Sequence, residues 1–384
     1  MAGSDDDSDI DSGASALPAR LRSRSRLADV ASAAGVGIAT VDRVLNERGN
    51  VSPATARKVI EAARLLALPR TLPVPYRRGL RVEVFMARRE TPFAERVNAA
   101  FLAVAATLDR SVIIQRTFVD EARPRAVAER LLATKADAIV LYGSEDGAIT
   151  DAVTRLTSGG VPVVTMVSDL PTSPRLAYVG IDHYGAGRSA AFFMARLSRP
   201  PGPIVVLTHS YAYRAHAERV SGFCDGLADH SPTSVVAGVF EGRDDQMRSE
   251  QGLLELVRAS DGAIGGVYNT GGANRAVERV LRTTGLAGKV VFIGQELTVH
   301  TARMLAEGTM TLVVDQNPEQ QARKAIDVLL RRFGYAPADE PLADVPYAIF
   351  GPENVPQGLV GPHAGTSSRV MPEQGEAAGV SPGR

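Results

Sequence analysis

The amino-acid sequence predicts an α/β protein with a small all-α head and a larger, two-lobed body of doubly wound parallel sheets. Three observations support this fold class. Residues 25–68 show only helical periodicity. Residues 80–335 alternate between apolar runs of strand length and segments of helical spacing, which is the pattern of parallel βα units. The stretch from Pro69 to Pro75 contains three prolines in seven residues, so residues 69–79 are expected to form a stiff, extended linker.

The head is organised around Leu27–Asn46, in which two short helices joined by a tight turn are expected. Apolar residues recur at i, i+3, i+4 and i+7 from Leu27 to Ala34, and Gly35 follows where the chain must enter the left-handed region. A second helix from about Ile38 to Leu45 would bury one side and expose a polar side. This arrangement favours a DNA-reading helix-turn-helix, although a three-helix bundle without a ligand fits the same spacing.

A third helix is expected to support this pair. Ser52 is a good N-cap and Pro53 suits the first helical position. An apolar stripe follows them at helical spacing, on Ala56, Val59, Ile60 and Ala63.

The charge of the chain is unevenly distributed. The formal net charge is zero, yet from Arg20 to Arg70 ten Lys and Arg outweigh four Asp and Glu, a local charge of +6. A basic head is typical of a phosphate-binding module, although a solvated surface is the simpler alternative. The acidic first 24 residues and the Gly, Ser and Pro-rich residues 363–384 are expected to be disordered tails.

Cysteine content and hydropathy exclude several protein classes. Cys224 is the only cysteine of the 384 residues, which rules out an internal disulfide framework and a cysteine-type zinc cluster and suits a reducing cytoplasm. No apolar run approaches the roughly 20 residues that a membrane helix requires, and no signal-peptide pattern is present.

The body repeats a strand-then-helix pattern, and its buried strands read as continuously apolar, as in VPVVTMV and GPIVVLT. The expected strands are Arg81–Met86, Ser111–Phe118, Ala136–Tyr142, Val161–Val167, Ala177–Ile181, Ile204–His209, Ser234–Phe240, Ala263–Tyr268, Val290–Ile293 and Thr311–Val314. The expected helices cover about 93–108, 123–134, 146–158, 185–198, 214–229, 244–259, 271–284, 298–307 and 318–332.

Two strands without a helix between them, near residues 161–181, mark the boundary between two lobes. Lobe 1 is expected to comprise residues 80–183 and 317–335, and lobe 2 residues 184–316 and 336–355, within an effector-binding domain of residues 80–362. Ligands of open α/β sheets bind outside the carboxyl ends of the strands, so the two lobes predict a cleft for a small molecule.

Polar side chains that follow the strands are the candidates for this cleft. Carboxylates, amides and an arginine suit a polyhydroxylated ligand, because each hydroxyl both donates and accepts, and an aromatic ring packs on the apolar face of a sugar. Any one of them would equally serve as a helix cap. The candidates are Arg88, Arg89, Glu90, Thr91, Phe93, Tyr142, Glu145, Ser168, Asp169, Asp182, His209, Tyr211, Asn269, Gln295, Glu296, Asp315 and Gln316, with Arg219 one turn into a helix.

Signals for catalysis are weak. The stretch GAGRSA, residues 185–190, matches the loose dinucleotide pattern, but Val205, Val206 and Leu207 stand where the acidic partner is expected. No P-loop, nucleophile elbow or zinc-protease motif occurs, and the six histidines lack metal-ligand spacing. We therefore expect no enzyme, no cofactor and no metal site.

The head residues Leu27–Asn46, followed by NVSPATARKVIEAA, resemble the DNA-binding head of LacI-family transcriptional repressors. Residues 80–355 are similar to the effector domain of that family, which shares its fold with periplasmic ribose- and galactose-binding proteins. The stretches that carry this similarity are VPVVTMVSD, YVGIDHYGAGRSAAFFM, RVSGF, GVYNTGGANRAV, FIGQELT and VVDQNPEQQARKAI. The resemblance implies a two-lobed, periplasmic-binding-protein-like body.

The resemblance also implies site residues. The second helix would lie in the major groove, with Arg43 pairing bidentately with guanine. Ligand contacts would come from the family's arginine, strand-end and aromatic positions. The implied DNA-binding residues are Ile38, Ala39, Thr40, Arg43, Asn46, Ser52 and Thr55, and the implied ligand-binding residues are Phe93, Asp169, Arg219, Asn269, Glu296 and Gln316. To these we add Asp42 of the same helix and Tyr211, whose ring suits the apolar face of a sugar.

Two residues and the linker depart from the family pattern. Asp42 and Gly37 stand where the family usually has serine, and a carboxylate near phosphates is unfavourable unless it pairs with an arginine or accepts from a cytosine. The family's linker usually forms a hinge helix whose leucine enters the minor groove. Pro69, Pro73 and Pro75 make that helix, and the DNA bend it imposes, improbable.

The sequence as a whole predicts a cytoplasmic, homodimeric transcriptional regulator of LacI type, and it favours a repressor over an activator. It would bind a pseudo-palindromic DNA operator, respond to a sugar or polyol between its lobes, and have no membrane partner. Two alternatives stay open. A sugar-binding protein that serves a transporter fits the body, and an NAD-dependent oxidoreductase is suggested only by GAGRSA.

Overall fold

The computed structural model describes residues 19–66, 68, 72–73, 79–87, 91–198, 202–336 and 345–359. The chain forms two compact units. Unit 1 contains Met1–Asp182, Tyr211–Ala217 and Gln316–Pro346, and unit 2 contains His183–Ser210, Glu218–Asp315 and Tyr347–Arg384. None of the helices in the described ranges is both long enough and apolar enough to cross a bilayer.

The head consists of α1 (Ala19–Ala34), α2 (Ile38–Leu45) and α3 (Pro53–Leu65). As predicted, Gly35 adopts a positive φ of 65°, and the Ser52 side chain accepts a hydrogen bond from the Thr55 backbone N–H. The three helices bury a common apolar core. It includes Val30, Val41, Val44, Leu45, Val59 and Ile60.

Helix α1 is longer than predicted. It begins at Ala19 rather than near Leu27, so residues 19–24 of the predicted disordered tail are helical. No glycine or proline interrupts Ala19–Ala34, and arginine, leucine and alanine are good helix formers, so the helix continues toward the N-terminus. The remaining tail residues 1–18 and residues 363–384 lie outside the described ranges.

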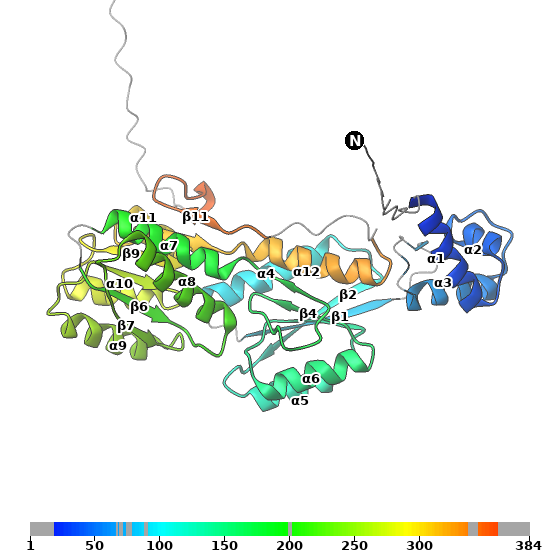
Figure 1. The fold of residues 1–384 in the computed structure, drawn as a ribbon, viewed down its shortest axis with the longest axis horizontal. Helices are drawn as coiled ribbons and strands as arrows, with labels where there is room; N and C mark the ends of the chain where they lie inside the picture. The colour runs from blue at the N-terminus through cyan, green and yellow to red at the C-terminus, as the bar shows by residue number, and fades with distance from the viewer. Residues whose placement is uncertain are drawn as a thin grey trace, which may run out of the picture. The chain divides into compact units, whose positions relative to one another are not determined.

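Unit 1 also holds a five-stranded parallel sheet in the order β2-β1-β3-β4-β5. Helices α5 and α6 pack together on one side, and α4 packs with α12 on the other (Figure 1). The strands are β1 (Leu80–Ala87), β2 (Val112–Val119), β3 (Ala138–Leu141), β4 (Val163–Met166) and β5 (Ala177–Val179); the helices are α4 (Pro92–Ala106), α5 (Pro124–Leu132), α6 (Gly147–Ser158) and α12 (Pro318–Arg332).

Unit 2 repeats the same strand order with one addition, as β11-β10-β9-β8-β6-β7. All its neighbours run parallel except β11, which pairs antiparallel with β10. The strands are β6 (Ile204–Thr208), β7 (Val236–Glu241), β8 (Gly266–Asn269), β9 (Val291–Gln295), β10 (Leu312–Asp315) and β11 (Ala348–Phe350); the helices are α7 (His183–Leu197), α8 (Arg214–His230), α9 (Gln246–Ala259), α10 (Asn274–Thr283) and α11 (Val299–Ala306).

The predicted fold class, a helical head with a body of parallel α/β sheets, is confirmed by this architecture. Strand β11 was not predicted, because three residues at a sheet edge are too short to show a period. The predicted lobe 2 included residues 211–217, 316 and 336–346, which belong to unit 1, and the predicted lobe 1 included His183, which belongs to unit 2. Most of the linker 69–79 lies outside the described residues, as do Arg88, Arg89 and Glu90.

Candidate functional site

The exposed side of α2 presents the predicted base-reading residues. Ile38, Ala39 and Arg43 are exposed, whereas Val41 and Leu45 hold the helix in the head core. Within the described part of the chain, the Arg43 guanidinium makes neither a hydrogen bond nor an ion pair, so all its donors are available to an external partner. Thr40 is half-buried on the same helix.

Asp42, the unexpected carboxylate of this helix, is neutralised within the head. Its Oδ2 lies 2.8 Å from Nη1 of Arg48, and its Oδ1 accepts a hydrogen bond of 2.7 Å from Nδ2 of Asn46. Asn46 also donates to the Asp42 backbone carbonyl. The pairing with Arg48 reduces the repulsion that Asp42 would exert on DNA phosphates. Because Asp42 pairs with Arg48, it does not occupy the Arg43 guanidinium.

Ser52 and Thr55, the two predicted phosphate contacts at the start of α3, contact each other. Their hydroxyl oxygens are 2.8 Å apart, and the Thr55 N–H donates to Ser52 Oγ. Ser52 is exposed and Thr55 is half-buried. The Ser52 hydroxyl therefore caps the helix and contacts the Thr55 hydroxyl, and each hydroxyl can form a further hydrogen bond.

Arg219 is the most unusual polar residue of unit 2. It lies on α8, only 2 % exposed, and its Nη1 donates to the Thr270 carbonyl at 2.8 Å. Its Nε and Nη2 atoms are buried and have no hydrogen-bond partner among the described residues. A buried cation with two unsatisfied donors is costly unless a ligand meets them, so the arrangement indicates a binding site.

Close helix packing fixes Arg219 in this position. A Cβ atom on Gly187 of α7 would lie 2.2 Å from the Arg219 backbone oxygen, and one on Gly222 of α8 would lie 2.1 Å from the Tyr184 backbone oxygen. Only glycine allows the backbones of α7 and α8 to approach so closely. Gly185 and Gly187 of the GAGRSA stretch thus lie inside a helix that begins at His183, not in a phosphate-binding turn.

A chain of amide hydrogen bonds connects the strand ends of unit 2. Asn269, at the end of β8, donates from Nδ2 to Oδ1 of Asn274 at 2.7 Å and to the Gly271 carbonyl at 3.1 Å. Asn274 in turn donates to the carbonyl of Gln295, at the end of β9. These bonds join the ends of β8 and β9 next to Thr270, whose carbonyl accepts from Arg219, and next to Glu296, and we call this region the polar cluster. Both amide hydrogens of Asn269 are used within the protein.

Gln295 and Tyr268 add a buried pair to this cluster. Nε2 of Gln295 donates to the Tyr268 hydroxyl at 3.1 Å, and Oε1 of Gln295 is buried without a hydrogen-bond partner among the described residues. Burial raises the pKa of Tyr268 to about 12, partly opposed by the positive charge of Arg219 and by the bond from Gln295. Tyr268 was not predicted, because it reads as the apolar end of a strand.

Glu296 occupies a left-handed backbone conformation at φ 70° and is 5 % exposed. Its N–H donates to the Val314 carbonyl and its carbonyl accepts from the Thr301 hydroxyl. Asp315, at the end of β10, accepts from the Leu297 N–H. A non-glycine residue held at positive φ by several bonds is typical of a functional position.

A second strained region lies at the ends of β6 and β7. Arg243 and Asp244 are both left-handed, at φ 53° and 51°. Asp244 Oδ2 is 3.3 Å from Nδ1 of His209, and Asp244 Oδ1 accepts from the Gly272 N–H at 2.9 Å. Asp244 was missed in the sequence because the run GRDD reads as an ordinary loop, and its partner His209 is distant along the chain.

In unit 1, the predicted Phe93 joins a row of aromatic rings. Its ring centre lies 6.3 Å from that of Tyr142, which lies 5.5 Å from that of Tyr213. Tyr213, which was not predicted, donates from its hydroxyl to Glu121 at 3.0 Å. The predicted Tyr211 is 46 % exposed. Aromatic rings of this kind can cover the apolar face of a sugar.

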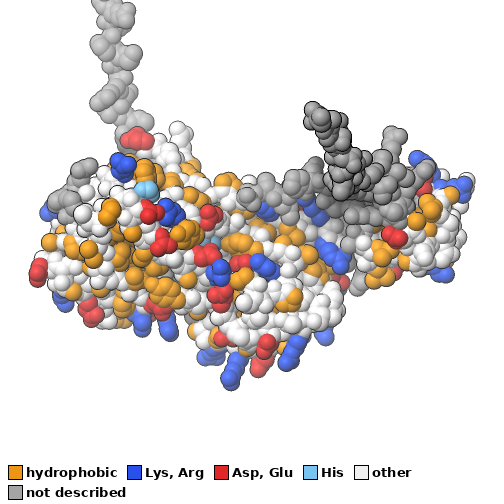
Figure 2. Space-filling model, viewed as in Figure 1, with side chains coloured by type: hydrophobic (Ala, Val, Ile, Leu, Met, Phe, Trp, Pro, Cys, Tyr) orange, Lys and Arg blue, Asp and Glu red, His pale blue; other side chains and the backbone are white. Residues whose placement is uncertain are grey.

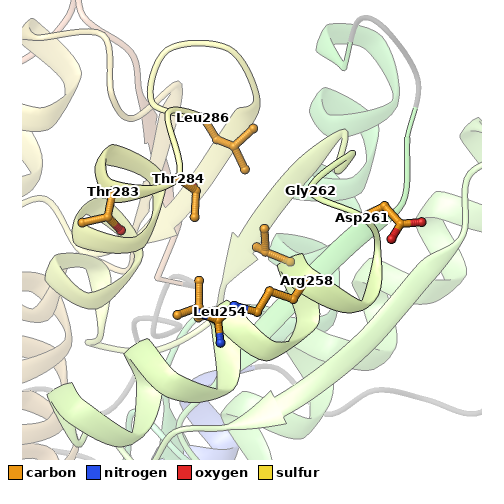
Figure 3. Close-up of a pocket in the computed structure, with 8 residues that line it drawn as sticks. Leu254, Arg258, Asp261, Gly262, Thr283, Thr284 and Leu286 are labelled. Carbon is orange, nitrogen blue, oxygen red and sulfur yellow. The ribbon is translucent and has the colours of Figure 1, made fainter.

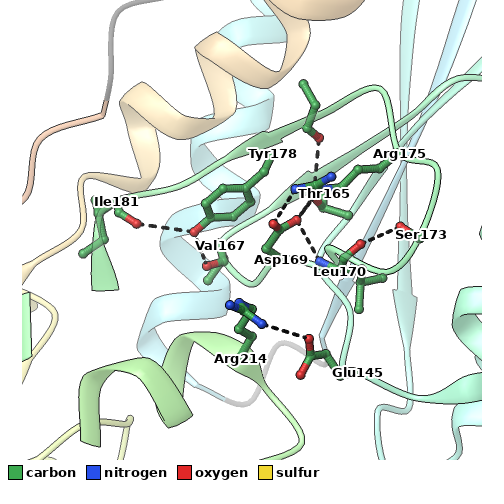
Figure 4. A network of polar contacts seen from close by, with 11 residues as sticks. Glu145, Thr165, Val167, Asp169, Leu170, Ser173, Arg175, Tyr178, Ile181 and Arg214 are labelled. Carbon is green, nitrogen blue, oxygen red and sulfur yellow. Dashed lines mark hydrogen bonds and ion pairs between the residues drawn. The ribbon is translucent and has the colours of Figure 1, made fainter. Parts of the chain in front are cut away.

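Asp169, also predicted to bind ligand, is occupied by intramolecular contacts (Figure 4). Its carboxylate forms an ion pair with Arg175, in which Nη2 lies 2.6 Å from Oδ2, and accepts from the Thr165 hydroxyl and the Leu170 N–H. These bonds fix the connection between β4 and β5. The sequence could not show this, because the pairing of Asp169 with Arg175 depends on the turn between them.

Gln316, the last predicted ligand residue, is 2 % exposed and directly precedes α12. Nε2 of Gln321 donates to its backbone carbonyl at 2.7 Å and approaches its Oε1 at 3.5 Å. Between the two lies Asn317, the N-cap of α12, which is left-handed at φ 54°.

Other surfaces of unit 2 are weaker candidates for a ligand site than the polar cluster around Arg219. A groove between the ends of α9 and α10, lined by Arg258, Asp261 and Thr283, precedes β8 and β9 along the chain (Figure 3). It therefore lies at the amino ends of the strands, whereas ligands of such sheets bind at the carboxyl ends. Over α7 and α8, charged side chains mix with hydrophobic ones (Figure 2). In the described ranges no three His, Cys, Asp or Glu residues are placed to hold a metal ion.

Comparison with known families assigns both parts of the chain. Residues 82–333 match the periplasmic binding protein domain, and residues 26–67 match the bacterial regulatory proteins of the lacI family. The second match covers α2, α3 and the residues of α1 that pack in the head core.

Individual relatives agree with this assignment. The chain is 25 % identical over 234 residues to the HTH-type transcriptional regulator GalS of Salmonella typhimurium, covering 60 % of this chain and 67 % of GalS. The glucose-galactose binding protein GanP of Geobacillus stearothermophilus shares the fold with a TM-score of 0.66 at 21 % identity, covering 72 % of this chain and 99 % of GanP.

A solute-binding protein of an ABC transporter from Burkholderia graminis, solved with D-arabinose, has a TM-score of 0.65 at 22 % identity, over 72 % of this chain and 97 % of that protein. At these identities the solved structures establish the fold alone. The chain therefore belongs to the periplasmic binding protein domain family and carries a lacI-family helix-turn-helix at its N-terminus, the architecture of a DNA-binding transcription regulator.

Proposed function

We propose that this regulator binds a pseudo-palindromic operator as a cytoplasmic homodimer, and that a sugar or polyol bound by the body changes its affinity for the operator. One observation carries the ligand part of the proposal. Arg219 offers two buried donors, Nε and Nη2, and Gln295 offers a buried acceptor, Oε1, none of which has a hydrogen-bond partner among the described residues. Each hydroxyl of a sugar donates one bond and accepts others, so a hydroxyl-rich ligand satisfies both kinds of atom.

The proposed DNA contacts rest on α2. Arg43 is exposed and without a partner in the described structure, while its neighbour Asp42 is paired with Arg48. A guanidinium free on the exposed face of a recognition helix can pair with O6 and N7 of guanine, which is the commonest base-specific contact. Ser52 and Thr55 would position the head on phosphates without specifying sequence.

The operator can be found by selecting duplexes from a random pool with the wild-type protein. We expect Arg43→Ala to weaken binding of the selected duplex and to relax its preference at one base pair per half-site, at a cost of about 1–3 kcal/mol. Arg258→Ala, on α9 of unit 2, is the matched control and should leave affinity and preference unchanged. Unaltered sequence preference in Arg43→Ala would count against α2 as the recognition helix.

The effector class can be tested by thermal unfolding with D-glucose, D-galactose, D-arabinose, sorbitol and xylitol. A sugar present at a hundred times its dissociation constant stabilises the protein by about 2.7 kcal/mol. We expect at least one compound to raise the melting temperature, and Glu296→Ala to remove that rise. Glu255→Ala, an exposed carboxylate on α9, should retain it. Loss of folding in Glu296→Ala would mean that Glu296 is a structural residue.

A sugar-binding protein that serves a transporter is the second candidate. The names of the solved relatives favour it, because GanP is described as a glucose-galactose binding protein. The head argues for the regulator, since residues 26–67 match lacI-family proteins and present an unpaired arginine on α2. Specific binding to a selected duplex, retained in excess nonspecific DNA, would decide for the regulator.

A further inference from the structure

Helix α12 connects a predicted ligand residue to the residue that anchors the head. At its N-terminal end, Gln321 is fully buried and donates from Nε2 to the carbonyl of Gln316. At its C-terminal end, the carbonyl of Gly334 accepts a hydrogen bond of 2.7 Å from the backbone N–H of Leu72. The helix of 15 residues between these points spans about 22 Å.

Leu72 belongs to the head as well as to this bond. Its side chain is 3 % exposed and forms part of the head core together with Leu68. Leu72 thus connects the head to α12, since its side chain packs with the head helices while its N–H donates to the Gly334 carbonyl. A backbone bond to a helix end and a buried side chain together fix both the position and the orientation of a residue.

The two ends of α12 are built differently from its middle. Asn317 at the start and Gly334 after the end both have positive φ, at 54° and 74°. Asn317 follows the point where the chain passes from unit 2 to unit 1, between Asp315 and Gln316. Residues with unusual backbone angles at such a crossing can absorb the rotation of a hinge.

Between its ends, α12 is tightly packed within unit 1. It packs against α4, β3, β4 and β5 through a buried apolar face. In the first turn of the helix, Glu319 forms a bidentate ion pair with Arg96 of α4, with Nη2 lying 2.9 Å from Oε2. A packed helix with such a brace moves as one body, so a displacement at Gln316 is transmitted to Gly334.

We propose that α12 transmits the state of the ligand site to the DNA-binding head, with Gln321 and Leu72 as positioning residues at its two ends. This role takes the place of the hinge helix that Pro69, Pro73 and Pro75 disfavour. The inference rests on the proposed function, because it concerns the coupling between sugar and operator. It does not involve contact of either residue with sugar or DNA.

The coupling is measured as the ratio of operator dissociation constants with and without the compound, among the five tested above, that most stabilises the wild type. A coupled regulator shows a ratio of about 5–150. We expect Gln321→Leu to bring the ratio within about twofold of unity while thermal stabilisation by that compound and sugar-free operator binding persist. Arg332→Gln, which changes an exposed side chain on the same helix, should retain the wild-type ratio.

Substitution of Leu72, in the linker, tests the contact at the C-terminal end of α12. Leu72→Ala should lose the coupling, whereas Leu65→Ala, which alters a side chain 77 % exposed on α3, should retain it. Insertion of Gly-Ser-Gly between residues 76 and 77 should also retain it, because the proposed route runs through Gly334 and bypasses that segment. Wild-type coupling in Gln321→Leu, or its loss on insertion, would overturn the proposal.

Hydrogen exchange tests α12 without any sugar or DNA. The Leu72 amide is protected by Gly334 in this structure. We expect Gln321→Leu to reduce its protection and Arg332→Gln to leave it unchanged; equal protection in Gln321→Leu contradicts the inference. If instead the wild type shows no sugar-dependent change in operator affinity, the proposed function fails, and the exchange measurement still decides whether α12 connects the two ends.

Discussion

Units 1 and 2 share a strand order, but in the described residues the buried polar atoms without a hydrogen-bond partner are concentrated in unit 2, with Oε1 of Gln321 the exception in unit 1. In unit 1, Asp169 is paired with Arg175, and the buried Glu83 of β1 accepts from Thr117, Arg130 and Thr134. In unit 2, Arg219 and Gln295 keep buried polar atoms without hydrogen-bond partners in the described structure. Satisfied groups stabilise a fold, whereas unsatisfied ones are tolerated where a ligand completes them.

The contrast extends to the backbone. Val167 follows β4 and Glu296 follows β9, which are equivalent strands in the two sheets, and both residues have positive φ, at 66° and 70°. In unit 1 the Val167 carbonyl accepts from the Tyr178 hydroxyl, so the strained turn is tied to its own sheet. In unit 2 the equivalent residue is a carboxylate beside the polar cluster. Both turns are held by hydrogen bonds, since the Glu296 carbonyl accepts from Thr301 as the Val167 carbonyl does from Tyr178, so the two positions differ in the side chain that the turn presents.

The largest effect on stability is expected at Glu83. Replacing it by leucine leaves Thr117, Thr134 and Arg130 without their shared acceptor, which should cost about 3–5 kcal/mol of unfolding free energy. Chemical denaturation of Glu83→Leu measures this loss. Glu129→Leu, an exposed position on α5, is the control and should change little. A small loss at Glu83 would show that unit 1 does not depend on its polar networks.

A smaller loss is expected for Asp169→Asn. The change removes the charge that Arg175 pairs with in a partly buried site, at about 1–3 kcal/mol. We expect the melting temperature to fall while the rise caused by the stabilising sugar persists, because the carboxylate is used within the unit. Disappearance of that rise in a folded Asp169→Asn protein would return Asp169 to the ligand-binding residues, as the sequence suggested.

Arg219→Met should behave in the opposite way. The buried guanidinium loses one bond to Thr270 and two unsatisfied donors, so the unfolding free energy of the sugar-free protein should change by less than about 1 kcal/mol. Thermal stabilisation by sugar should be abolished. A strong destabilisation without sugar would show that Arg219 supports the fold as Asp169 does, and the contrast between the units would disappear.

The smallest effect concerns pH. The pKa of Tyr268 rises to about 12 on folding, from an ordinary value near 10, so deprotonation favours the unfolded state as pH rises above about 10. At about pH 10.5 this should cost the wild type less than about 1 kcal/mol. Tyr268→Phe should lack this part of the alkaline decline when unfolding is followed from pH 8 to 10.5. An identical decline in both proteins would contradict the burial of the hydroxyl.

The fold could be read from the sequence because its signals are local. The alternation of apolar runs with helical spacing located every strand from β1 to β10, and Ser52 and Pro53 located the start of α3. Strand β11 and the early start of α1 were missed. Strand β11 is too short to show a period, and the start of α1 lacks an N-terminal cap signal.

The site was less predictable, because its chemistry depends on contacts between distant residues. Strand-end position placed Glu296 and Gln316 among many candidates, its position one turn into a helix added Arg219, and the family resemblance then selected all three. The sequence could not reveal that Asp169 is paired with Arg175 or that both amide hydrogens of Asn269 are used. Nor could it reveal that Gln295 donates to the Tyr268 hydroxyl. Those facts follow from turns and packing that the sequence does not spell out.

The most direct test compares operator affinity with and without the stabilising sugar in the wild type and in Arg219→Met. The account predicts a sugar-dependent change of at least about fivefold in the wild type and none in Arg219→Met, with equal sugar-free affinities. Equal responses in the two proteins, or no response in the wild type, would contradict it.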